Sequence, residues 1–352
     1  MNATRQAPFL PKLWTVLREG YRPADFRHDA MAGLTVAIVA LPLAMALAIA
    51  SGTTPDKGLV TAVVAGFLIS ALGGSRFQIG GPTGAFIPVV YTVIATHGYD
   101  GLVLATLMAG VMLIAAGLLK TGTLMRFMPQ PLVTGFTSGI AVIIATSQLK
   151  DALGLDVAKV PAEFLPKLRV LAAHLGETDP WALGMAAASV ALIAGLRRWA
   201  PRAPGFLLAV LAAAGATALW QLPVDTIGSR FGGIPSSLPM PHWPAVSPER
   251  LVALLPSALT IAFLAGIESL LSAVVADGMS GGKHRPNTEL VAQGIANTAS
   301  ALVGGLPATG AIARTATSIR SGARTPVAGM LHALLVLAVF GNASMWMAVF
   351  AD

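Results

Sequence analysis

The sequence has 352 residues, of which 55% are hydrophobic and only 11% are charged. Soluble domains carry roughly a quarter charged residues, and a single soluble core stops growing near about 250–300 residues. Most of the apolar surface must therefore face lipid, which makes the chain an all-α polytopic membrane protein. The absence of cysteine excludes disulfides and thiolate sites. We interpret the net charge of +7 as basic loops beside anionic lipid, and we expect no nucleic-acid partner.

Apolar segments follow one another along the chain, and several are near the roughly 20 residues needed to cross hydrocarbon. Two are shorter and begin with Gly and Pro, in GGPTGAF (80–86) and GGLPATGAIAR (304–314). Such segments are typical of half-helices that end inside a transporter. The predicted spans are 31–51, 58–73, 82–96, 101–118, 132–149, 181–196, 205–220, 252–276, 288–303, 308–319 and 325–340, with a weak apolar tail at 343–350.

The distribution of basic residues predicts the orientation. With the N-terminus inside, alternating crossings place most of the 23 lysines and arginines on the inner side. The first thirty residues are polar and do not resemble a signal peptide. We therefore expect a cytoplasmic N-terminus. We also expect the membrane to be the bacterial inner membrane.

Two blocks of the sequence resemble each other. Residues 59–74 (LVTAVVAGFLISALGG) and 290–305 (LVAQGIANTASALVGG) share Leu, Val, Ala and the final two Gly without gaps. Each block leads to a Gly/Pro-interrupted segment, and the predicted crossings give these two segments opposite directions. Chance similarity between apolar helices is the alternative, but the shared Thr-Gly-Ala favours an inverted repeat with a binding site at its interface.

The two short segments carry the predicted substrate site. A helix N-terminus leaves unpaired N–H groups and a partial positive charge, so two opposed N-termini can hold an anion away from water. Pro82 and Pro307 suit the helix starts. The threonine hydroxyls either contact substrate or only cap the helices. The predicted substrate-binding residues are Thr83, Gly84, Ala85, Phe86, Thr309, Gly310, Ala311 and Arg314.

Ionisable residues inside the predicted spans are few. Glu268 is the one acid of sixteen placed in the middle of a span, and Arg314 is the one basic residue within a span. Charges at this depth are functional candidates. Arg314 either attracts the anion or forms a buried ion pair with Glu268. Glu268 can carry a coupling proton, or can ligate a coupling cation such as sodium with Ser272, four residues later on the same face.

Other features bear on function more weakly. Phe86 and the segment Ala40–Met45, bent at Pro42, either line the site or only pack. The sequence contains no HExxH motif, paired histidines or P-loop, so we expect no metal, no cofactor, no ATP-driven step and no enzymatic activity.

Several runs together resemble the sulfate permease family of anion transporters. They are DAMAGLTVAIVALPLAMALAIASG (29–52), GGPTGAF, MPQPLVTGFTSGIAVII (128–144) and the long run 265–329. The resemblance implies two inverted repeats of seven segments, a core that holds the substrate and a gate that forms a homodimer contact. It places the substrate between the third and tenth segments, which match the two short segments here. It also matches Arg314 to the tenth-segment arginine and Glu268 to the eighth-segment acid linked to coupling.

The resemblance also defines the expected domains and two departures. We expect a cytoplasmic segment at 1–30 and a transmembrane domain at 31–352, with the core at about 31–118 and 252–340. The gate would take about 128–220 and the C-terminal remainder. The last spans of the family and its C-terminal STAS domain are expected to be missing. Glu268 stands where sodium-dependent bicarbonate members have Asp, which favours a proton at least as much as sodium.

The leading hypothesis is secondary active transport of a small anion by an elevator-like movement. A nucleobase-type carrier, an anion channel and a scaffold without transport remain alternatives. Sulfate, bicarbonate, chloride and carboxylates are all suitable substrates, and the sequence does not distinguish symport from exchange.

Overall fold

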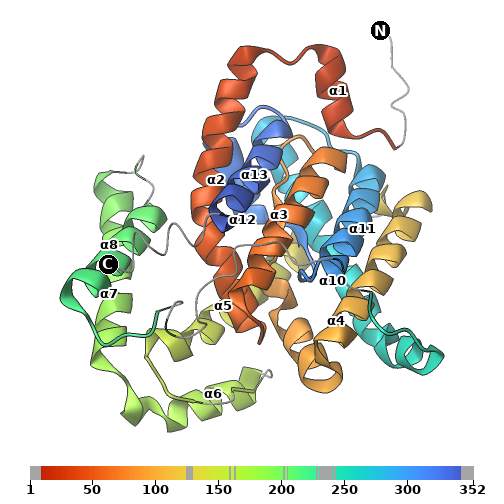
Figure 1. Cartoon of the computed structure of the whole chain (residues 1–352). Coiled ribbons are helices and arrows are strands. Elements are labelled where there is room, and N and C mark those ends of the chain that lie inside the picture. Colours follow the sequence, from red (N-terminus) through yellow and green to blue (C-terminus); the bar gives the residue numbers. More distant parts are fainter. Residues whose placement is uncertain are drawn as a thin grey trace. The chain divides into compact units, whose positions relative to one another are not determined.

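The computed structural model describes residues 9–123, 130–157, 160–161, 164–200, 203, 205–226, 229, 241 and 243–341. Within these residues the regular structure is helical apart from two short strands (Figure 1). The chain divides into two compact units, residues 1–134 with 237–340 and residues 135–236 with 341–352. The first unit contains every predicted substrate and coupling residue. Its functional identification as a core, and that of the second unit as a gate, stay predictions.

The first unit contains most of the long helices. Prolines occupy the first positions of α2, α3, α10 and α11, where a missing N–H leaves no helical hydrogen bond unmade. The elements are α1 (Lys12–Glu19), α2 (Pro23–Ala50), α3 (Pro55–Leu72), β1 (Gly80–Gly81), the 3₁₀ turn η1 (Gly84–Phe86), α4 (Ile87–Leu118), α10 (Pro248–Ser280), α11 (Pro286–Leu302), β2 (Thr309–Gly310), α12 (Ile312–Arg320) and α13 (Val327–Gly341).

Some of the described helices are long enough to cross a bilayer. Five are long and apolar enough to cross a membrane, namely α2, α3, η1 with α4, α7 and α10. The shorter apolar helices are Leu208–Trp220 and Val327–Phe340. Helices lie over the predicted spans, whereas the predicted tail at 343–350 falls outside the described residues.

The first short segment differs from its prediction. The predicted spans 82–96 and 101–118 form one continuous element, in which Gly98 interrupts the helical backbone with φ 70° and ψ 178°. Glycine adopts this positive φ without the steric penalty of a Cβ atom. Neither Pro82 nor Pro307 starts a helix as predicted, because helical structure begins at Gly84 in the first segment and at Ile312 in the second. The half-helix therefore ends at a single glycine rather than at a longer loop.

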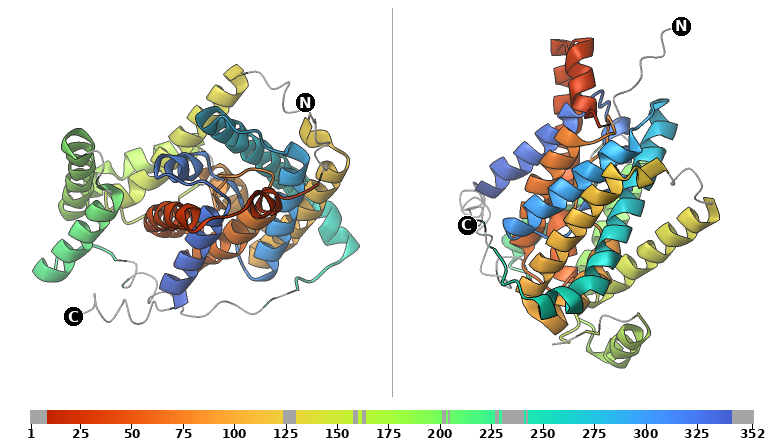
Figure 2. Two further views of the ribbon diagram at one scale, coloured as in Figure 1. Left: turned by 90° about the horizontal axis from the view of Figure 1, so that it is seen from above. Right: turned by 90° about the vertical axis from the view of Figure 1, so that its right-hand side faces the viewer.

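Helices α4, α10 and α11 pack side by side in the first unit (Figure 2). The buried apolar cluster among them includes Leu113 of α4, Ala265 of α10 and Leu290 of α11. Gly294 of α11 lies against the α4 backbone, where a Cβ atom would stand 2.5 Å from the Gly110 carbonyl oxygen and 2.8 Å from the Ile114 nitrogen. This close approach lets α11 support the segment that follows it.

The second unit contains α5 (Gln130–Ala152, which begins in the first unit), α6 (Phe164–Ala173), the 3₁₀ turn η3 (Leu175–Glu177), α7 (Pro180–Trp199) and α8 (Gly205–Trp220). Asp179 caps α7, because its carboxylate accepts hydrogen bonds from the N–H groups of Trp181 and Ala182. Helices α7 and α8 pack together. A small cluster of Leu155, Val157 and Leu171 packs α6 against the chain that follows α5.

We predict that Gly294→Ala destabilises the protein, because the new methyl group must displace the α4 backbone. Overpacking of this kind costs about 1–3 kcal/mol. Thermal unfolding of the purified protein in detergent measures the effect. Gly278→Ala is the matched control, since a Cβ atom at Gly278 in α10 has no neighbour within 4 Å. Equal unfolding temperatures for the two variants would contradict the close packing.

Candidate functional site

The two Gly/Pro segments meet as a pair of short strands. β1 and β2 are antiparallel, with Gly80 opposite Gly310 and Gly81 opposite Thr309. The contact continues beyond Gly80 at Ile79, whose carbonyl accepts from the Ala311 N–H at 2.8 Å and whose N–H donates to Thr315 Oγ1 of α12 at 3.0 Å. The strand pair therefore joins the two predicted half-helices directly, in the antiparallel sense that an inverted repeat predicts.

The helix starts leave main-chain donors beside the strand pair. N–H groups in the first turn of a helix have no earlier helical carbonyl to bond. Gly84 and Ala85 begin η1, whereas the Phe86 N–H already donates to the Thr83 carbonyl at 3.3 Å. On the other segment α12 begins at Ile312, one residue after Ala311. Because the Ala311 N–H is bonded to Ile79, the Ile312 and Ala313 amides are the donors at this end that sequence reasoning missed.

The two threonine hydroxyls both bond to α10 rather than to their own helices. Thr83 Oγ1 donates to Glu268 Oε2 at 2.8 Å, and Thr309 Oγ1 donates to the Ala265 carbonyl at 2.9 Å. Thr83 stands at the cap position of η1 without making a side-chain cap bond. The two hydroxyls therefore do not cap the helices, which was one of the two roles considered for them. Each hydroxyl still has an oxygen lone pair that can accept a further hydrogen bond.

Arg314 links the second half-helix to the first. Its side chain is 2% exposed, with Nη2 donating to the Pro82 carbonyl at 2.5 Å and Nη1 reaching the Gly80 carbonyl at 3.5 Å. Gly81 lies between these carbonyls with φ +146°, and a Cβ atom there would stand 2.5 Å from Nη1. Only glycine therefore suits position 81. The guanidinium keeps its charge next to both helix starts.

Glu268 and Ser272 have different surroundings, although they lie one turn apart on α10. The Glu268 carboxylate is buried and bonds to Thr83, as described above. Ser272 Oγ donates to Thr315 Oγ1 at 3.2 Å, so its hydroxyl is directed to α12. In the described part of the chain the two charged residues, Glu268 and Arg314, form no ion pair within 4.0 Å. The guanidinium instead bonds to main-chain carbonyls.

Phe86, one of the residues predicted to line the site with apolar surface, belongs to the hydrophobic core. Phe86 is 2% exposed and belongs to the buried cluster with Val90 and Leu113. Its packing role is therefore observed, and a contact with substrate stays a prediction. Pro42 lies inside the continuous helix α2.

Polar side chains from α3 and α11 hold the loop before β2, and sequence reasoning missed them. Asn297 forms two hydrogen bonds of 2.8 Å to the main chain of Ala308, one as donor and one as acceptor. Ser300 Oγ donates to the Leu306 carbonyl at 2.9 Å, and Thr61 Oγ1 accepts from the Leu306 N–H at 2.6 Å. The available signal was polar residues within the two repeated blocks.

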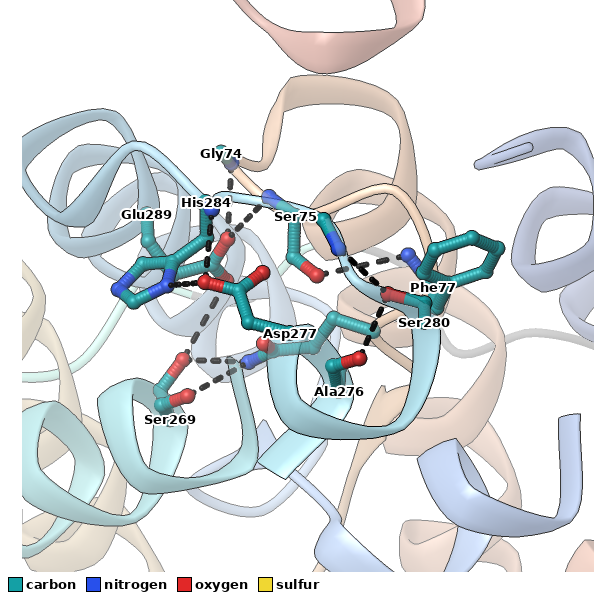
Figure 3. Close-up of polar contacts among 11 residues, drawn as sticks. Gly74, Ser75, Phe77, Ser269, Ala276, Asp277, Ser280, His284 and Glu289 are labelled. Carbon is teal, nitrogen blue, oxygen red and sulfur yellow. Dashed lines mark hydrogen bonds and ion pairs between the residues drawn. The ribbon is translucent and has the colours of Figure 1, made fainter. Parts of the chain in front are cut away.

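Two further acids in the described part of the chain are fully buried, although neither lies in the middle of a predicted span. The Asp29 carboxylate in α2 accepts hydrogen bonds from Thr325, from the Arg324 N–H and from Tyr21. Glu289 in α11 accepts from main-chain N–H groups of Gly74 and Ser75 (Figure 3). Both lie at or near the ends of predicted spans, where the sequence pattern does not distinguish a buried acid from a loop acid.

Known proteins resemble this chain over most of its length. The model of the sulfate permease family matches residues 26–348. A Bacillus subtilis protein named as a candidate sulfate transporter, YvdB, is 46% identical over 322 residues, which cover 91% of this chain and 61% of that protein. The bicarbonate transporter BicA of Picosynechococcus is 33% identical over 330 residues, which cover 91% of this chain and 58% of BicA.

Solved structures show the same fold. The transmembrane domain of a cyanobacterial bicarbonate transporter BicA superposes with a TM-score of 0.83 at 32% identity, covering 92% of this chain and 84% of that chain. The murine Solute Carrier 26 family member A9 anion transporter gives a TM-score of 0.84 at 17% identity, covering 98% of this chain and 61% of that chain, which shows the fold alone.

The predicted all-α polytopic fold is thereby confirmed. The chain spans about three-fifths of the length of the curated relatives described above, at 61% and 58%. The matched proteins are named as transporters and not as enzymes. This agrees with the expectation from the sequence. The chain belongs to the sulfate permease family.

Proposed function

We propose that the protein is a secondary active transporter of small oxyanions, bound between the start of η1 and the start of α12. The observation that carries this proposal is the joining of two helix starts by β1 and β2 beside the buried guanidinium of Arg314. Unpaired N–H groups and a fixed positive charge in a site shielded from water favour a negative ligand. A neutral nucleobase would leave that charge without a counterion, so the geometry favours the anion.

Sulfate and bicarbonate are the substrates to test first. Several N–H donors at two helix starts suit an anion with several acceptor oxygens. The names of the relatives give the same two candidates, a bicarbonate transporter at 33% identity and candidate sulfate transporters at 46% and lower identity. Chloride and carboxylates complete the panel, because main-chain amides also hold these anions.

Glu268 is the proposed coupling group, with a proton as the first coupling ion to test. Thr83 connects it to the first helix start, so a change in the charge of the carboxylate reaches the substrate site through a single hydrogen bond. Ser272 bonds to Thr315 rather than to Glu268, and sodium held by Ser272 and Glu268 is the second coupling ion to test. Neutralisation by a proton would remove the negative charge that opposes an incoming anion.

The strand pair suggests how the site moves. Because β1, β2 and Arg314 tie both helix starts together, the substrate site moves as one body, which suits an elevator-like mechanism. The inner membrane, a cytoplasmic N-terminus, the seven-plus-seven inverted repeat and a homodimer are part of the same proposal.

Uptake into proteoliposomes tests the proposed function. The protein is reconstituted and offered labelled sulfate, bicarbonate, chloride and carboxylates, with and without imposed pH and sodium gradients. We expect saturable uptake of one oxyanion that accelerates with a gradient. Electrical current far above carrier turnover would identify an anion channel, and absence of flux for every anion would support a scaffold.

We predict that Arg314→Ala raises the KM for the anion at least about tenfold, because a charge-assisted hydrogen bond contributes about 1.5–3 kcal/mol. Loss of the bonds to Gly80 and Pro82 also releases the first helix start. Concentration-dependent uptake measures the change. Arg320→Ala, an exposed position at the end of the same helix, is the control. An unchanged KM in the Arg314 variant would remove this residue from the site.

We predict that Glu268→Gln makes uptake insensitive to the driving gradient while substrate still binds, because the amide cannot gain or lose a proton. Uptake rates across a series of imposed pH differences give the dependence. Glu249 is exposed near the start of the same helix, and Glu249→Gln should keep the dependence of uptake on the pH difference. A parent-like gradient response in the Glu268 variant would show that coupling occurs elsewhere.

A further inference from the structure

The side chain of Gln78 lies directly against β2. It precedes β1 by two residues and is 3% exposed. A Cβ atom built on Gly310 would collide with the side-chain nitrogen and carbonyl carbon of Gln78. The amide therefore fills the space that a side chain at position 310 would take, and its position determines where β2 can lie.

Ser269 of α10 holds this amide in place. Gln78 Nε2 donates to Ser269 Oγ at 2.6 Å and to the Ser269 carbonyl at 3.2 Å. The Ser269 hydroxyl in turn donates to Glu289 Oε1 at 3.3 Å, and its side chain is fully buried (Figure 3). A hydroxyl has a single hydrogen to donate. The chain from Gln78 through Ser269 to Glu289 therefore has one direction, with the carboxylate as its final acceptor.

Glu289 is surrounded by donors. Its Oε2 accepts from the N–H groups of Gly74 at 2.8 Å and Ser75 at 3.1 Å, and its Oε1 also accepts from Gln293 Nε2 at 3.2 Å. An ionised carboxylate accepts all of these bonds without offering a competing hydrogen. Glu289 thus joins α11, α10 and the loop between α3 and β1 at one point.

We propose that Glu289 is a positioning residue for the anion site, acting through Ser269 and Gln78 to hold β2 against β1. Its effect on transport rests on the proposed function, whereas its effect on the strand pair does not. Glu289 is not itself proposed as a ligand of the anion. Its carboxylate is the final acceptor of a hydrogen-bond chain that begins at Gln78, behind Gly310.

Replacement by glutamine tests the direction of the chain. In Glu289→Gln the side-chain oxygen is needed by the N–H groups of Gly74 and Ser75, so the amide N–H₂ faces Ser269 and Gln293. The Ser269 hydroxyl then loses its acceptor and Gln293 meets a second donor. The chain that orients Gln78 is broken while the volume of the side chain is kept.

The experiment compares Glu289→Gln, Ser269→Ala and the parent, with Ser51→Ala as the matched control. Ser51 is buried and its hydroxyl donates to Leu47 of its own helix, outside the chain described here. Hydrogen–deuterium exchange of peptides covering 305–316 reports the strand pair, where the Ala311 N–H is bonded to Ile79. Anion uptake by the same preparations gives KM and maximal rate separately.

In Glu289→Gln and in Ser269→Ala, the backbone amides of 305–316 should exchange about three- to tenfold faster than in the parent, as the loss of one hydrogen bond predicts. The KM for the anion should rise by a similar factor. Ser51→Ala should match the parent in both measurements. Hydrogen–deuterium exchange in Ser269→Ala at the rate of the parent overturns the proposal. If Glu289→Gln fails to fold, Ser269→Ala still tests the chain, because it removes only a hydroxyl. If the parent moves no anion, the proposed function fails, but the exchange data still decide the positioning role.

Discussion

The structure depends on one constraint, which is that a helix beginning inside the membrane needs partners for its first N–H groups. Water is absent there, so each unpaired group is costly unless protein or ligand satisfies it. β1 and β2 satisfy main-chain groups of the two segments that precede the helices, because the two strands pair with each other. The N–H groups just beyond the strand pair remain for a ligand. The anion site that we propose follows from how the two segments are joined.

Helix α10 connects this arrangement to the rest of the first unit. The Ala265 carbonyl accepts from Thr309, Glu268 accepts from Thr83, and Ser269 accepts from Gln78. Ser272 completes the series by bonding to Thr315. Consecutive turns of one helix thus hold both half-helices. The proposed change of charge at Glu268 would act on the same helix that holds both segments.

The site that we propose rests on local signals in the sequence. The Gly/Pro segments 80–86 and 304–314 indicated two broken helices, and the few charges inside spans indicated Glu268 and Arg314. The break at Gly98 was expected as a loop between two spans, because a glycine alone does not reveal a positive φ. The hydrogen bond from the Ala311 N–H to Ile79, which directs one predicted donor away from the ligand, needs the strand register. The contacts of Gln78 with Ser269 and of Asp29 with Thr325 join residues far apart in the chain, and no local pattern encodes such pairings.

The most direct test of the central claim locates a bound anion. Selenate is a sulfate analogue whose selenium atom scatters anomalously, so crystals of the protein grown with selenate mark the anion by an anomalous difference peak. The account predicts one peak within hydrogen-bond reach of the N–H groups at both helix starts, near Gly84 and Ile312. A peak that contacts only exposed basic residues, with none between the helix starts, would contradict it.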